Sequence, residues 1–163
     1  MEKQKLTIVP YSSKYEKAFY DLNEQWIKEY FKMEATDIAS LSDPEGYIIN
    51  KGGHIIIGSL FDEEGIETVV AVCALIKMID HDFDYELAKM AVDPNYHGNG
   101  FGYQIAKATI DLAKELKVKS VYLESNRKLT PAITLYHKIG FVEVFGYETP
   151  YERANIQMVL RLV

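Results

Sequence analysis

Residues 92–102 read Val-Asp-Pro-Asn-Tyr-His-Gly-Asn-Gly-Phe-Gly, with glycines at 98, 100 and 102. They follow a run typical of a strand, about 85–92, and precede an amphipathic run typical of a helix, about 101–117. Glycines let the backbone curl tightly and let a ligand approach it closely. The first turn of a helix presents unpaired N–H groups and a partial positive charge. The segment is therefore a candidate site for a phosphate or a pyrophosphate.

This glycine segment differs from two common phosphate-binding motifs. It lacks the Gly-Lys-Ser/Thr of a P-loop, and the spacing of Gly98, Gly100 and Gly102 is not the Gly-x-Gly-x-x-Gly of dinucleotide folds. A glycine-rich strand-to-helix turn that binds no ligand is the alternative interpretation.

The rest of the chain divides into segments of strand-like and helix-like patterning. Further strands are predicted at 5–10, 54–60, 68–79, 120–124, 141–147 and 155–162, and further helices at about 14–31, 36–41 and 131–139. Ser13 and Thr130 are predicted N-caps, Pro131 the first residue of its helix, and Gly140 the residue that ends it.

The order β-α-α-β-β-β-α-β-α-β-β predicts one α+β domain with a mixed sheet, spanning residues 1–163. The three central strands are joined by short turns and predict an antiparallel meander. The strand-helix-strand unit from 85 to 125 predicts a right-handed parallel crossover.

Composition narrows the class of protein. The chain has 163 residues, of which 48% are apolar and 26% charged, which is typical of a globular domain. Its formal net charge of −6 argues against a general nucleic-acid binder. The longest apolar run, Val69–Ile76, is too short to span a membrane, and Met1–Lys5 leads into no apolar signal core. A single cysteine, Cys73, fits a reducing cytoplasm, and the four histidines show no metal-ligand spacing, so we expect no metal.

A second motif, Ala132-x-x-x-Tyr136-x-x-x-Gly140-Phe141, follows the glycine segment. Together with His97-x-x-Gly100-x-Gly102 and the run 86–94, it resembles the GCN5-related N-acetyltransferase (GNAT) superfamily over about 83–145. The usual pattern there is Arg/Gln-x-x-Gly-x-Gly/Ala, then Asn-x-x-Ala-x-x-x-Tyr-x-x-x-Gly-Phe.

Two positions depart from that family pattern. His97 stands where Arg or Gln is usual, and its ring can still donate an N–H. Leu129 stands where Asn is usual, and Asn126 is the candidate to take over the polar contact with the cofactor.

The resemblance implies that acetyl-CoA binds between two splayed parallel strands, here those that end near Val92 and Glu124. The first strand would bulge near Met90–Val92, where backbone groups of Met90, Ala91 and Val92 would pair with the pantetheine amides. The remaining cofactor contacts implied are His97, Gly98, Asn99, Gly100, Phe101, Gly102, Asn126, Ala132 and Tyr136. The resemblance also implies that the C-terminal strands can pair into a homodimer.

Acyl transfer to an amine requires a neutral amine and a protonated leaving thiolate. By the resemblance, Tyr136 is the candidate general acid; the alternative is a core tyrosine bonded to backbone. Glu86 is the first candidate base, because an apolar strand would raise the pKa of its carboxyl group. A strand-edge carboxylate paired with Lys or Tyr is the equal alternative. Lys89 should alternate onto the opposite strand face from Glu86 and be structural.

The acceptor pocket is the least determined part. Tyr30 and Phe31, with Trp26, could wall it, and Glu24 could attract an amine, although packing and solvation explain such residues equally well. Lys138 is a candidate partner for the outer phosphate of the cofactor or a solvated helix lysine.

Three hypotheses for function follow. The first is an N-acetyltransferase in which the primary amine of a small molecule or a protein attacks acetyl-CoA directly in a ternary complex. The second is a non-catalytic acyl-CoA-binding sensor on the same fold. The third is an interaction subunit that uses a tyrosine-rich surface.

Overall fold

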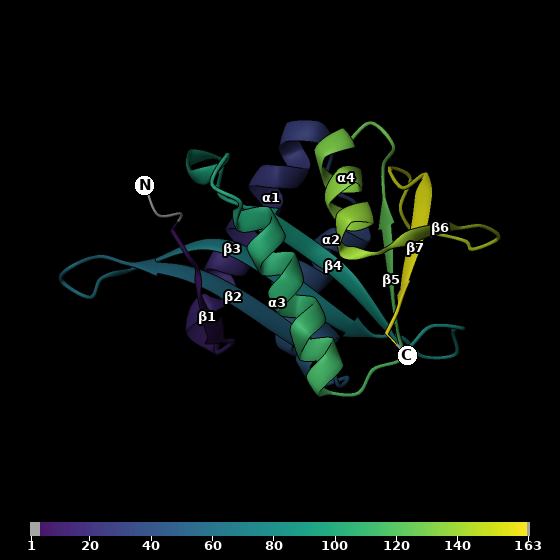
Figure 1. Cartoon of the computed structure of the whole chain (residues 1–163), viewed down its shortest axis with the longest axis horizontal. Coiled ribbons are helices and arrows are strands. Elements are labelled where there is room, and N and C mark those ends of the chain that lie inside the picture. Colours follow the sequence, from purple (N-terminus) through teal and green to yellow (C-terminus); the bar gives the residue numbers. More distant parts are fainter. Residues whose placement is uncertain (1–3, 163) are drawn as a thin grey trace.

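In the computed structural model, which describes residues 4–162, the chain forms one seven-stranded mixed sheet with helices on both faces (Figure 1). The strands are β1 (Thr7–Pro10), β2 (His54–Phe61), β3 (Glu67–Lys77), β4 (Tyr85–Val92), β5 (Ser120–Ser125), β6 (Val142–Val144) and β7 (Ile156–Arg161). The helices are α1 (Glu16–Tyr30), α2 (Ala35–Ser42), α3 (Phe101–Glu115) and α4 (Thr130–Ile139), with short helical turns η1 (Ser13–Tyr15), η2 (Glu45–Ile49) and η3 (Pro94–Tyr96). The predicted α+β fold and element order are confirmed. Residues 1–3, part of the stretch in which we expect no export signal, and residue 163 lie outside the described residues.

Both predicted N-caps are wrong. Ser13 begins the 3-10 turn η1, so that α1 starts only at Glu16. Leu129, not Thr130, precedes α4, and it makes no side-chain cap. The predicted end of that helix is confirmed, because Gly140 has a φ of 119°, a left-handed conformation that glycine adopts without a steric penalty.

The sheet separates two hydrophobic cores. Helices α3 and α4 cover one face and lie in front of the sheet in Figure 1, and α1 and α2 lie behind it. Successive residues of β3 alternate between the cores, with Cys73 on the α3 side and Val72 and Ala74 on the α1 side. This alternation explains why β3 reads as a continuous apolar run, since both of its faces are buried.

Strands β4 and β5 form the predicted splayed parallel pair. The sheet order is β1-β2-β3-β4-β5-β7-β6, and the β4–β5 ladder holds only Tyr85↔Val121 and Glu86↔Tyr122. Beyond Glu86 the edge of β4 that faces β5 is therefore unpaired, although β4 remains paired with β3 as far as Val92.

A β-bulge in β4 lies slightly before the predicted position. The ladder with β3 shifts register between Ala74↔Ala88 and Val72↔Ala91, and Lys89 within the bulge has a φ of 53°. The bulge exchanges the two faces of the strand: Leu87 packs in the α3 core and Ala91 in the α1 core, although an unbroken strand would place them on the same side.

Among residues 4–162, no helix is long and apolar enough to cross a membrane.

Candidate active site

A cavity of about 130 Å³ lies where β4 and β5 separate. Helix α1 lines it with Trp26, and Phe31 follows directly after that helix; α4 contributes Ala132 and Tyr136, and the segment before β7 contributes Tyr151 and Arg153. The strands contribute residues 86–90 and 124–125, followed by Asn126. The structure therefore brings the two predicted catalytic residues, Glu86 and Tyr136, to one cavity.

Tyr136 reaches the cavity from the buried side of α4, where its ring packs edge-on against Phe141 at a centroid distance of 5.9 Å. Burial, together with the nearby Cys73 thiol, raises the pKa of its hydroxyl above the ordinary value. No hydrogen-bond partner for this hydroxyl occurs between residues 4 and 162, so the predicted alternative of a tyrosine bonded to backbone does not apply there. The hydroxyl keeps its proton at neutral pH and is free to donate a hydrogen bond.

Glu86 carries a carboxyl group whose pKa is raised to about 7. Burial is the main cause, the negative charge of Glu124 adds to it, and Lys89 opposes it. Within the described part of the chain, Glu86 makes no ion pair and no side-chain hydrogen bond. A partly buried carboxylate that is half-protonated near neutral pH suits proton transfer.

Glu124 enters the same cavity from the end of β5. It accepts a hydrogen bond of 3.1 Å from the hydroxyl of Tyr122, and it has no basic partner among residues 4–162. The cavity therefore carries two carboxylates that form no ion pair with any residue from 4 to 162, although the charge of Lys89 acts on Glu86.

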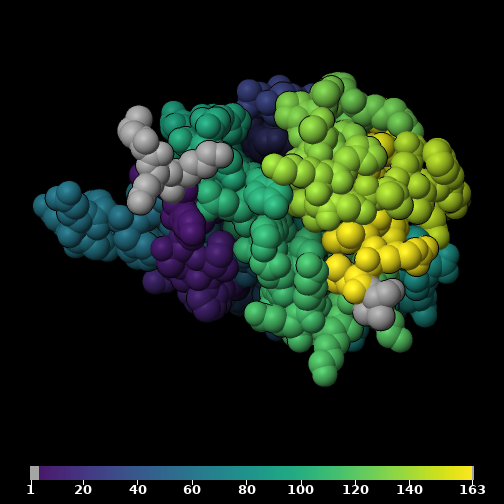
Figure 2. Space-filling view, viewed as in Figure 1, coloured from purple at the N-terminus to yellow at the C-terminus, as the bar shows by residue number. Residues whose placement is uncertain are grey.

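The glycine segment before α3 leaves its backbone open. Gly98 and Gly100 have φ values of 82° and 79°, and a Cβ added at either would meet no atom of residues 4–162 within 4 Å. The polar side chains turn back onto the segment itself: Asn99 Nδ2 donates to the Tyr96 carbonyl at 2.8 Å, and His97 Nε2 lies 3.3 Å from the Val92 carbonyl. A recess separates the start of α3 from α4 on this face (Figure 2).

Asn126 lies at the cavity, but its amide is already engaged. Its Nδ2 donates to the Arg153 carbonyl at 2.6 Å, and its Oδ1 accepts from the Lys128 N–H at 3.0 Å. Asn126 thus joins the end of β5 to the segment before β7, in addition to any contact with a cofactor.

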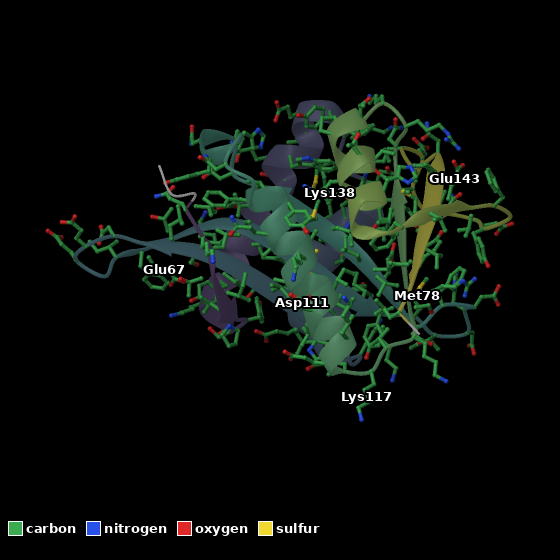
Figure 3. The ribbon with its side chains drawn as sticks, in the orientation of Figure 1. Glu67, Met78, Asp111, Lys117, Lys138 and Glu143 are labelled. Carbon is green, nitrogen blue, oxygen red and sulfur yellow. The ribbon has the colours of Figure 1, made fainter. Side chains whose placement is uncertain are left out.

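The predicted acceptor residues divide into two groups. Phe31 lines the cavity, together with Trp26. Tyr30 does not line it and is 40% exposed, and Glu24 pairs with Lys28 at 3.4 Å along α1. Lys138 lies on the side of α4 toward α3 (Figure 3), with its Nζ 4.8 Å from the centre of the Tyr103 ring.

A buried ionic cluster, which the sequence did not reveal, closes one side of the cavity. Asp37 of α2 is fully buried and accepts from Lys89 Nζ at 2.6 Å and from two Arg153 nitrogens at 2.6 and 2.7 Å. Arg153 also pairs with Glu34 at 3.1 Å, and Lys89 donates to the Tyr151 hydroxyl at 2.9 Å. We call these five residues the Asp37 cluster. The expectation that Lys89 lies on the opposite face from Glu86 is wrong, because the bulge turns Lys89 toward α2 and both residues line the cavity.

The Asp37 cluster predicts an acid-labile contribution to stability. Burial alone would raise the pKa of Asp37, but hydrogen bonds from Arg153 and the charge of Lys89 outweigh it and lower the pKa to about 2. A carboxyl pKa below its unfolded value stabilises the fold above about pH 4, and this contribution is lost as the pH falls toward 2.

In urea unfolding, the free energy of unfolding of the wild type should therefore fall between about pH 5 and pH 2 by roughly 2–3 kcal/mol more than that of Asp37→Asn. At neutral pH the variant should be less stable by about 3–5 kcal/mol, because two buried cations lose their partner. Asp111→Asn, at an exposed ion pair with Lys107, is the matched control and should follow the wild type. Parallel pH profiles for wild type and Asp37→Asn would contradict the prediction.

Between residues 4 and 162, no group of three or more His, Cys, Asp or Glu side chains is arranged to hold a metal ion. Burial raises the pKa of the Cys73 thiol to about 12, so the thiol is not a nucleophile at neutral pH.

Comparison with known proteins identifies relatives of this arrangement. An acetyltransferase of the GNAT family from Staphylococcus aureus superposes with a TM-score of 0.81 at 22% identity, covering 97% of this chain and 99% of that one. A GNAT superfamily phosphinothricin acetyltransferase from Sinorhizobium meliloti, solved in complex with acetyl-CoA, gives a TM-score of 0.75 at 13% identity, covering 98% and 89%. At these identities the likeness concerns the fold.

Sequence comparison gives a narrower but closer match. The N-alpha-acetyltransferase RimI of Mycobacterium tuberculosis is 34% identical over 73 residues, which cover 45% of this chain and 44% of RimI. The match thus spans less than half the length of that relative. The acetyltransferase (GNAT) family itself matches over residues 10–141, a range that includes the glycine segment, both splayed strands and Tyr136. The chain therefore belongs to the GNAT acetyltransferase family.

Proposed function

We propose that the protein is an N-acetyltransferase that transfers the acetyl group of acetyl-CoA to a primary amine by direct attack in a ternary complex. One observation carries the proposal: the unpaired edge of β4 beyond Glu86 borders a cavity that holds Tyr136 and two carboxylates. An extended ligand can pair with such an edge as an added strand, and the cavity then surrounds its reactive end.

The residues present fit acetyl-CoA. Backbone groups of Met90, Ala91 and Val92 would pair with the pantetheine amides, as an added strand does. The N–H groups of residues 98–102 at the start of α3 would hold the diphosphate, and the absence of neighbours within 4 Å of Gly98 and Gly100 leaves room for it. When bound, acetyl-CoA supplies the acetyl group as an activated thioester.

Glu86 is proposed as the group that removes the amine proton. An alkyl ammonium ion has a pKa near 10.4, so only about one molecule in a thousand is neutral at pH 7. A carboxyl group with a pKa of about 7 is ionised often enough to accept that proton, directly or through water. A backbone N–H near Ala91 would stabilise the oxyanion.

Tyr136 is proposed to act at the leaving sulfur. Its raised pKa makes complete proton transfer to a thiolate unfavourable, so the hydroxyl acts chiefly by donating a hydrogen bond from Oη as negative charge develops. A phenol can assist a leaving thiolate by transferring its proton or by donating a hydrogen bond. The raised pKa favours the hydrogen bond.

The acceptor is the open part of the proposal. RimI of Mycobacterium tuberculosis is an N-alpha-acetyltransferase, which supports a protein amine, one of the two classes of acceptor predicted from the sequence.

Two measurements test the function. Calorimetry should detect acetyl-CoA binding, and the bound ligand should raise the melting temperature, because it stabilises only the folded state. A thiol-release assay against a panel of amines should then show turnover. Binding without release from any amine would indicate a non-catalytic acyl-CoA-binding module, and a lack of binding would contradict both.

A further inference from the structure

The charges around the cavity form two separate groups. Four charged side chains line it: Glu86, Lys89, Glu124 and Arg153. The two cations belong to the Asp37 cluster, whereas the two carboxylates have no basic partner among the residues that the structure describes. The cavity is therefore negative toward a ligand, although it is lined by equal numbers of acidic and basic residues.

Lys89 and Arg153 are balanced in charge by partners within the Asp37 cluster. Their two positive charges are matched by Asp37 and Glu34, whose side chains are 0% and 13% exposed. Both oxygens of Asp37 are used: Oδ1 accepts from Lys89 and Arg153, and Oδ2 from Arg153 and the Glu34 N–H. Lys89 also donates to Tyr151 and lies 4.8 Å from the centre of its ring. A ligand carboxylate would have to compete with these buried partners for either cation.

Glu86 and Glu124 present the opposite situation. They come from the two splayed strands and face one cavity, with Tyr136 beside them and the aromatic rings of Trp26 and Phe31 on the α1 side. An ammonium group bound there finds two carboxylates and aromatic faces, all of which favour a cation. A carboxylate one carbon away from that ammonium would meet Glu86 and Glu124, while the cations that line the cavity are already balanced by Asp37 and Glu34.

One further cation lies nearby, outside the cavity lining. Lys128 Nζ sits 4.2 Å from the centre of the Phe31 ring and donates to the Tyr30 carbonyl at 3.3 Å. Its side chain is exposed, so water screens its charge.

We propose that the Asp37 cluster sets acceptor specificity: by occupying Lys89 and Arg153, it restricts the acceptor to primary amines without an adjacent carboxylate and excludes free α-amino acids. The inference rests on the proposed function, since it concerns the amine that shares the cavity with the acetyl group. It assigns Asp37 and Glu34 a role as specificity-determining residues that do not touch the acceptor.

Equilibrium binding to the wild-type protein with coenzyme A bound gives the primary test. Phenethylamine and L-phenylalanine share a skeleton and differ in the carboxylate, and L-phenylalaninamide has the size of the acid without its charge. By calorimetry at about pH 7, the amine and the amide should bind about tenfold or more tightly than the acid. Equal or tighter binding of phenylalanine, or no binding of any of the three, would overturn the inference.

Binding is read separately from turnover, so the two proposals fail in different ways. Thiol release is measured with the same three compounds and acetyl-CoA. The predicted binding preference without thiol release from any amine would count against the proposed transferase activity alone. Thiol release with phenylalanine preferred would count against the specificity alone.

Variants separate the cluster from other causes. Glu34→Gln removes one partly exposed countercharge, and it should reduce the preference for amide over acid about threefold. Asp37→Asn should reduce it about tenfold in whatever fraction of the protein folds. Arg153→Met and Lys128→Gln each remove a cation, whereas Glu34→Gln and Asp37→Asn leave a cation without its countercharge. The preference for amide over acid should therefore be kept in Arg153→Met and Lys128→Gln. A preference unchanged in Glu34→Gln and Asp37→Asn, or lost in Lys128→Gln, would refute the assignment.

Discussion

Tyr136→Phe is expected to lower turnover about 100-fold or more while leaving acetyl-CoA affinity within about twofold. The ring stays buried against Phe141, so packing in α4 is preserved and only the hydroxyl is lost. That hydroxyl has no partner between residues 4 and 162, and its removal therefore leaves no buried polar group unsatisfied. Steady-state thiol release gives kcat, and calorimetry gives the affinity.

Tyr147→Phe is the matched control. Its hydroxyl bonds Asp82 at 3.0 Å in the aromatic cluster with Phe83 and Tyr122, and it does not line the cavity, so turnover should stay at the wild-type level. If Tyr136→Phe and Tyr147→Phe are equally active, Tyr136 has no role at the leaving group.

Glu86→Gln should reduce turnover by about 10²–10⁴-fold and abolish the acidic limb of the pH–rate profile. In the wild type the base works only when ionised, so kcat/KM should fall as the pH drops below a value near the Glu86 pKa of about 7. A glutamine has nearly the same shape but cannot accept the proton. A wild-type limb that persists in Glu86→Gln would assign the titration to another group.

Glu124→Gln provides the matched comparison for this limb. The negative charge of Glu124 helps to raise the pKa of Glu86, so its removal should shift the limb toward lower pH. A limb that stays in place in Glu124→Gln would mean that the two carboxylates do not interact.

The sequence was most informative where local chemistry decides the structure. The glycine segment, the end of α4 at Gly140 and the apolar run of β3 each depend on neighbouring residues, and each was predicted close to its observed place. The splayed strands and Tyr136 came from the family motifs rather than from periodicity. The helix starts at Glu16 and Thr130 were missed, because a 3-10 turn and a non-capping Leu129 replaced the expected caps.

The acceptor side could be predicted only in part, because it depends on distant contacts. A strand period of two placed Lys89 opposite Glu86, and no local pattern marks the bulge that breaks the period. Asp37 meets Lys89 across 52 residues and Arg153 across 116, so neither partner could be identified from spacing. Of the candidates on and directly after α1, Trp26 and Phe31 line the cavity, whereas Tyr30 and Glu24 do not.

The separation between Asp37 and Arg153 also bears on how the protein is made. Everything that would bind the pantetheine and the diphosphate lies between residues 86 and 136, and it is translated before Arg153 is joined to the chain. Asp37 and Lys89 are also translated before Arg153, so the guanidinium is the last charged group of the Asp37 cluster to be added. The part of the molecule that is proposed to select the amine is thus completed after the part that would hold the coenzyme has been synthesised.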